Sequence, residues 1–261
     1  MSTDQDTIGR TQASEFFRLE RRESDLPFYR GVPVKLALSG WLIVLCALAV
    51  GYLLLVVAQQ PFHEGLAGFI PPILFVAAPL IALAIVAGRS GVMSLFRPIR
   101  PSDFLTVVGF FILNWIVTIL LGMLAIKLFS ASANPASGMV TSADTADRVL
   151  FYGWTAVQLV GEELITILPF LAFLAFLDRL IGRKAAIILA AFGASVIFSL
   201  IHLPAYQWNV PHVLFAFVPI RMVLLAPYIL TRNLWVSAAT HILNDWTIFT
   251  IAILAAPGSA T

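Results

Sequence analysis

Long apolar stretches separated by short polar segments dominate the chain from residue 36 to its end. A membrane-spanning α-helix needs about 20 predominantly apolar residues. Seven stretches approach or exceed that length, so the pattern predicts an all-α polytopic membrane protein. We expect a bundle of about seven transmembrane helices, with an eighth left open. The predicted spans cover residues 36–58, 66–87, 104–129, 149–177, 185–203, 211–230 and 234–256.

The composition agrees with this pattern. Of the 261 residues, 60% are hydrophobic and only 11% are charged, with a mean hydropathy of +0.93. Soluble domains carry about 45–50% apolar and about 25% charged residues, so a soluble enzyme is nearly excluded. Disorder is excluded because it needs low hydrophobicity and high charge. A net charge of +2 gives no ground for a nucleic-acid partner.

The positions of Lys and Arg predict the orientation. Outside the spans, 13 of these residues fall in the N-terminal segment and in alternate loops, and the other side carries only Arg148. Because cytoplasmic loops are enriched in Lys and Arg, we expect a multi-pass integral membrane protein with a cytoplasmic N-terminus. Residues 1–35 are predicted to be a solvated, cytoplasmic polar tail, followed by a transmembrane domain over 36–256. The segment 130–148 is predicted to be a flexible external loop.

Ionisable residues inside the spans are the candidate functional groups, because a charge at membrane depth is costly. Glu162 and Glu163 lie near the middle of the fourth span, and His202 ends the fifth. His241 and Asp245 lie one turn apart on one face of the seventh span. The two adjacent glutamates point about 100° apart around their helix. One of them therefore faces a site while the other anchors it.

These residue types suit hydrolysis by either of two mechanisms. A buried glutamate can take a proton from water, and imidazoles with an amide or an acid can hold a developing oxyanion. The same groups could instead bind a divalent metal such as zinc, through Glu162, His202 and His241. The sequence leaves both mechanisms open, and no other cofactor is expected.

Three short motifs on three spans carry a family resemblance. Glu162-Glu163, then Phe198 to His202, then His241 to Asp245 follow the order of the patterns EExxxR, FxxxH and HxxxN/D. Residues 231–241 also resemble the usual approach to the last motif. Over residues 149–250, a catalytic-like core, the chain resembles the CAAX-protease and bacteriocin-processing family of intramembrane proteases.

The resemblance implies an endopeptidase that acts on a membrane-associated or lipidated peptide in the bilayer. It implies that Glu162 activates water with His202 as its partner. His241 and Asp245 would stabilise the oxyanion or bind a metal, and Glu163 would be structural. Three further residues are assigned to support the site: Asn244, Arg221 and Phe198.

The first motif departs from the family pattern, because Ile167 stands where EExxxR has its arginine. Glu163 therefore has no cationic partner on its own helix. Arg221 lies midway along the sixth span at a similar depth, and it stays charged there because arginine does not lose its proton in proteins. We predict that Arg221 pairs with Glu163 between helices. Helix geometry further predicts that Asp245, rather than Asn244, faces the site on the His241 side.

Two other functions remain open from the sequence. A non-catalytic membrane adaptor would keep the fold and lose the chemistry, and a proton-coupled transporter is less favoured although it uses similar residues. The simple topology also contains a conflict of depth. It puts His202 near the outer end of the fifth span, while His241 lies only about 10 Å from the inner end of the seventh. Convergence requires that one of these spans be tilted or begin deeper.

Overall fold

The computed structural model describes residues 15–62, 64–130 and 135–256, and within these ranges the chain is helical and contains no strand. Among the described residues, seven helices are long and apolar enough to cross a membrane, which confirms the predicted all-α polytopic bundle. The spans are α2 (Leu38–Ala58), η2 with α3 (Gly65–Phe69 and Ile70–Met93), α4 (Pro101–Phe129), α6 (Thr145–Leu177), α7 (Arg183–Ile201), α8 with η4 and α9 (Val210–His212, Val213–Phe217 and Val218–Thr231), and α10 (Leu234–Ala255).

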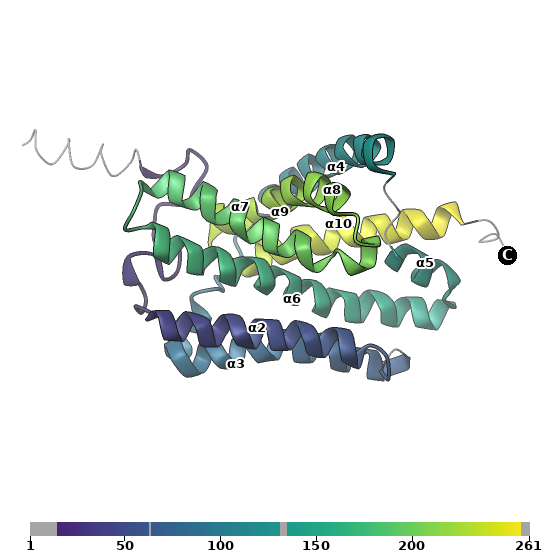
Figure 1. Cartoon of the computed structure of the whole chain (residues 1–261), viewed down its shortest axis with the longest axis horizontal. Coiled ribbons are helices and arrows are strands. Elements are labelled where there is room, and N and C mark those ends of the chain that lie inside the picture. Colours follow the sequence, from purple (N-terminus) through teal and green to yellow (C-terminus); the bar gives the residue numbers. More distant parts are fainter. Residues whose placement is uncertain (1–14, 63, 131–134, 257–261) are drawn as a thin grey trace, which may run out of the picture.

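Helix α6 is the centre of the bundle. In Figure 1 it runs between the α2–α3 pair on one side and α7, α9 and α10 on the other. It is also the most buried span, with 67% of its apolar stretch inside the protein. Gly161 allows a close approach to α3, because a Cβ at this position would lie 2.3 Å from Cδ1 of Phe75. This contact presses α6 against α3 at the residue that precedes Glu162.

Helix α4 lies at the edge of the bundle, against α9 and α10 (Figure 1). Only 6% of its apolar stretch is buried inside the protein. A helix with so little protein contact and such high hydropathy faces lipid over most of its surface. Helix α4 thus forms an outer wall, separate from the α6 core.

The segment predicted as a flexible loop is partly helical. Helix α5 occupies Pro135–Ser142, and α6 already begins at Thr145. The Asp144 carboxylate accepts from the amide of Asp147 (2.9 Å) and caps α6. Arg148 donates to the carbonyls of Val140 and Thr141 (3.2 Å each), which satisfies the end of α5. The loop prediction is therefore wrong for residues 135–148, while residues 131–134 lie outside the described ranges.

Residues 15–37, here called the N-terminal strap, cross one end of the bundle. The strap buries the side chains of Glu20, Leu26, Phe28 and Tyr29 against the helices. The solvated tail predicted for residues 1–35 is therefore wrong over the described part, and residues 1–14 lie outside the described ranges. The many charged residues of this segment are typical of a solvated tail. The sequence pattern did not indicate its burial because the partners of these charges come from distant helices.

Glu20 ties the strap to two helix ends. Its carboxylate accepts from Nη1 of Arg183 at 2.9 Å, at the start of α7. It also accepts from Nη2 of Arg232 at 2.7 Å, in the turn between α9 and α10. All three side chains are at most 1% exposed. Asp25 adds a second acceptor for Arg183 at 2.7 Å. We call the end of the bundle that carries this network the basic end.

The strap covers the turn between α9 and α10. Arg232 and Asn233, which connect α9 to α10, are buried beneath it, with 1% and 0% of their surface exposed. The amide of Arg21 donates to the Leu230 carbonyl at 3.1 Å, and the amide of Leu234 donates to the Leu95 carbonyl at 2.9 Å. Helix α10 therefore begins inside the protein rather than at its edge. The Phe198 ring lies 4.5 Å from the His202 ring and 6.3 Å from the His241 ring, so the depth difference counted from the sequence does not keep these residues apart.

Replacing Glu20 by alanine is expected to destabilise the protein. The change leaves two buried guanidinium groups without their shared carboxylate, and breaking one side of a buried pair costs about 3–5 kcal/mol. We expect a clear fall in the thermal unfolding midpoint of the detergent-solubilised protein. Glu23→Ala is the matched control, because Glu23 pairs with Arg100 at the surface, with 65% of its side chain exposed. Such exposed pairs contribute about 0–1 kcal/mol. Equal midpoints for the two variants would contradict the structural role of Glu20.

Candidate active site

A fully buried ion pair joins α6 to α9. Nη2 of Arg221 lies 2.7 Å from Oε1 of Glu163, and both side chains are 0% exposed. The Ser237 hydroxyl on α10 donates to the other carboxylate oxygen. Ile167, at the position where EExxxR has arginine, is fully buried in the hydrophobic core. An interhelical pair thus replaces the local one, as the sequence predicts.

The ion pair also orients His241. Nδ1 of His241 lies 2.9 Å from Oε1 of Glu163 and 3.1 Å from Nη1 of Arg221. Because a carboxylate only accepts and a guanidinium only donates, we assign the Nδ1 proton to the contact with Glu163. The opposite nitrogen, Nε2, then faces Glu162 (3.9 Å to Oε2) and Asp245 (3.8 Å to Oδ1). Glu163 therefore fixes which edge of the imidazole points to these two carboxylates.

The two adjacent glutamates have different surroundings. Glu163 is completely buried, whereas 13% of the Glu162 side chain is exposed. Glu162 therefore faces the open side of the cluster and Glu163 anchors it, which is the division expected from helix geometry.

A glutamine pair that the sequence reading did not single out reaches Glu162. Nε2 of Gln158 donates to Oε1 of Glu162 at 3.0 Å. Gln158 in turn accepts from Nε2 of Gln59 at 3.2 Å, and Gln59 lines a cavity of about 480 Å³ beside Trp154. The available signal was a polar residue in an apolar span, one helical turn before Glu162. Two amides thus connect this cavity to the Glu162 carboxylate.

Asp245 and Asn244 point to different neighbours. Oδ1 of Asn244 accepts from Nδ2 of Asn114 on α4 at 2.8 Å. Nδ2 of Asn244 donates to Oδ1 of Asp245 at 2.9 Å. Asp245 therefore lies on the His241 side, and Asn244 links it to α4. The sequence reading missed Asn114, whose partner is 130 residues away.

His202 joins the cluster through Phe198. Its Nδ1 lies 2.8 Å from the Phe198 carbonyl, which only accepts, so Nδ1 carries a proton, and in the neutral imidazole Nε2 has a free lone pair. The Phe198 ring lies 4.5 Å from the His202 ring and 6.3 Å from the His241 ring. The Arg221 guanidinium lies over the same ring at 4.4 Å. On its other side, His202 contacts Phe217 in the π-helical turn η4, 5.4 Å between ring centres.

Tyr206 is a second residue that the sequence reading missed. It follows α7 in the short helix η3 (Pro204–Tyr206) and is 6% exposed. Burial raises the pKa of the Tyr206 phenol, and the negative charges of Asp245 and Glu162 raise that pKa further. Tyr206 is therefore a buried, neutral phenol in the electrostatic field of both carboxylates.

The arrangement does not fit a resident divalent metal. In the three described ranges, no group of three or more His, Cys, Asp or Glu side chains is placed to hold one. The Arg221 guanidinium, 3.1 Å from Nδ1 of His241, already supplies positive charge beside this ring. We therefore derive no step through a metal bound by Glu162, His202 and His241.

The fold and this cluster define a polytopic helical membrane protein with a buried carboxylate and imidazole site. Residues 146–247 match the family model described as type II CAAX prenyl endopeptidase Rce1-like. The match confirms the resemblance to the CAAX-protease and bacteriocin-processing intramembrane proteases over that segment. Comparison of the chain with curated proteins and with solved structures finds no match. The segment contains the candidate residues Glu162, Glu163, Phe198, His202, Arg221, His241, Asn244 and Asp245.

The Glu163–Arg221 pair can be tested by a double-mutant cycle on stability. Arg221→Met alone leaves a buried carboxylate uncompensated, so we expect a loss of about 3–5 kcal/mol in the free energy of unfolding. Glu163→Gln with Arg221→Met should recover much of that loss, because neither charge then remains. The readout is denaturant or thermal unfolding in detergent. Strictly additive losses in the double variant would show that the pair contributes no coupling.

Proposed function

We propose that the protein is an intramembrane endopeptidase in which Glu162 activates water. The observation that carries this proposal is the position of the His241 imidazole. Its Nε2 lies within 4 Å of both Glu162 and Asp245, at 3.9 and 3.8 Å, while its Nδ1 is held by Glu163. Ionisable groups are rare within membrane spans and cluster where chemistry or transport needs them.

The first step is the attack of water on the peptide carbonyl. Glu162 takes a proton from the water as its oxygen bonds to the carbonyl carbon. Nε2 of His202, with its free lone pair, accepts the second hydrogen of the water as a hydrogen bond and orients it. Gln158 holds the Glu162 carboxylate in place from the opposite oxygen.

The second step is collapse of the tetrahedral intermediate. In its doubly protonated form, His241 donates through Nε2 to the oxyanion, and the Arg221 charge behind it adds to the stabilisation. The carbon–nitrogen bond then breaks, and the proton on Glu162 passes to the leaving amine. Asp245 is negatively charged when ionised and would repel an oxyanion. We therefore assign it to orienting His241 from the Nε2 side.

We further propose that the substrate is a membrane-associated or lipidated peptide, and that the basic end faces the cytoplasm. The first proposal is supported by the place of the site among apolar spans and by the description of the matched family as CAAX prenyl endopeptidase. The second is supported by the 13-to-1 distribution of Lys and Arg between the two sides.

Cleavage of a peptide in proteoliposomes tests the proposal. The wild type should cut a fluorogenic peptide that carries a C-terminal prenyl group. Glu162→Gln keeps the side-chain volume but removes the base, so kcat/KM should fall by about 10²–10⁴-fold. His202→Ala should also lose most activity. Glu23→Gln is the control, a carboxylate removed at the surface. Wild-type cleavage by Glu162→Gln would refute the assigned base.

The same preparation separates the alternative functions. Proton flux without cleavage would indicate the transporter. Neither activity, together with copurification of one membrane partner, would indicate the adaptor.

Gln158 should act on catalysis as a positioning residue. Gln158→Leu removes a hydrogen bond to a charged group, which contributes about 1.5–3 kcal/mol. We expect kcat to fall about 10- to 100-fold with little change in KM. Gln59→Leu should have a smaller effect, because Gln59 contacts Gln158 and not Glu162. Gln60→Leu, in the lining of the same cavity, is the control. An equal effect of all three changes would show that the cavity, and not the hydrogen bond, matters.

A further inference from the structure

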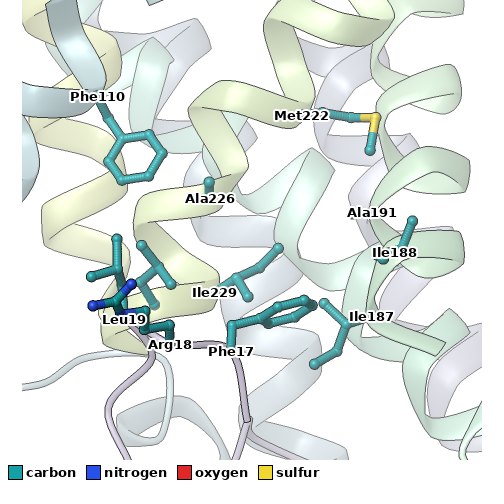
Figure 2. A pocket seen from close by; sticks show the side chains of 11 residues that line it. Phe17, Arg18, Leu19, Phe110, Ile187, Ile188, Ala191, Met222, Ala226 and Ile229 are labelled. Atoms are coloured by element: carbon teal, nitrogen blue, oxygen red, sulfur yellow. The ribbon is translucent and has the colours of Figure 1, made fainter. Parts of the chain in front are cut away.

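An apolar groove lies on the outside of the bundle, away from the candidate active site. It is a cavity of about 430 Å³ with α9 behind it, α7 on one side, Phe110 of α4 on the other, and the strap across its lower end (Figure 2). Its walls carry aliphatic side chains such as Ile188 of α7 and Ala226 of α9. Both α4 and α7 pack on α9, and the groove is the space between α4 and α7.

The groove extends from the basic end to about the middle of the span Val210–Thr231. Leu230 lies one residue before the end of α9, and Met222 lies nine residues before it. At 1.5 Å per residue the groove is about 13 Å deep. Half of a bilayer core of about 30 Å is about 15 Å. The groove therefore has about the depth of the hydrocarbon of one leaflet.

The mouth of the groove is positively charged. Arg18 of the strap lines it, and Lys184 in the first turn of α7 lies 5.9 Å from the Phe17 ring. Over the described ranges neither cation has an acidic partner, whereas the neighbouring Arg21 is paired with Asp103. Unpaired cations at the membrane surface attract anionic headgroups, each contributing about 1 kcal/mol.

We propose that the groove binds one acyl chain of an anionic phospholipid, with the headgroup against Arg18 and Lys184. An apolar groove in the hydrocarbon region is not filled by water, so a lipid chain is the occupant that its depth and lining fit. The charge at the mouth selects the headgroup. The bound lipid contacts the strap, α7 and α9 together and so stabilises their packing at the basic end. This site is independent of proteolysis.

Lipid titration of the full-length protein tests the headgroup. Delipidated protein in detergent is titrated with phosphatidylglycerol or phosphatidylcholine of the same chain length, and bound lipid is counted by native mass spectrometry. We expect phosphatidylglycerol to bind at least about fivefold more tightly. Arg18→Gln should remove about fivefold of that affinity. Arg22→Gln, an exposed arginine of the strap outside the groove, should not. Equal binding of the two lipids, or equal effects of the two variants, would overturn the proposal.

Filling the groove tests the acyl-chain site. Ala226→Phe should weaken binding of both lipids, because the added ring fills the groove from α9. Ile188→Trp, which fills it from α7, should do the same. Ala49→Phe, at an exposed position of α2, is the control. If Ala226→Phe does not fold, Ile188→Trp decides, since Ile188 is 51% exposed. Unchanged binding in the folded variants would overturn the site. Displacement of the phospholipid by a prenylated peptide would assign the groove to a substrate and would also overturn it.

Discussion

The buried carboxylate of Glu163 is the constraint on which the rest of the site depends. A charge at this depth cannot be solvated by lipid, so the protein itself must supply its partners. Arg221 comes from α9, and Ser237 and His241 come from α10. Three helices are thus tied together around one side chain of α6. The same contacts set the direction of His241, so structural stability and the geometry of the site have a common origin.

At the basic end, a second buried carboxylate also joins several parts of the protein. Glu20 meets Arg183 and Arg232, which would otherwise be buried charges at the ends of α7 and α9. Because the strap supplies Glu20, the turn between α9 and α10 can lie inside the protein. The strap therefore holds the start of α10, the helix that carries His241, without being part of the site.

The division of roles within the site follows from burial. Groups that are fully enclosed, Glu163 and Arg221, have all their strong contacts within the protein and act as a scaffold. Glu162 and Asp245 are partly exposed instead, with 13% and 20% of their side chains accessible. Phe198 lies between the two histidine rings and beneath the guanidinium, so an apolar ring links the polar residues of three helices. The family match covers the segment that contains all of these residues.

The sequence alone determined the spans and the unmet charges. Twenty apolar residues in a row are a local property, and a mid-span Glu163 without an arginine at position 167 already demands a partner such as Arg221. Only the tertiary structure decided the packing of the strap, the helix α5, and the contacts of Gln158, Asn114 and Tyr206. These depend on neighbours far away in the chain, and a polar residue alone does not reveal which distant group will satisfy it. The burial of the turn between α9 and α10 was decided in the same way, because a buried turn looks identical to an exposed one in the sequence until the segment that covers it is in place.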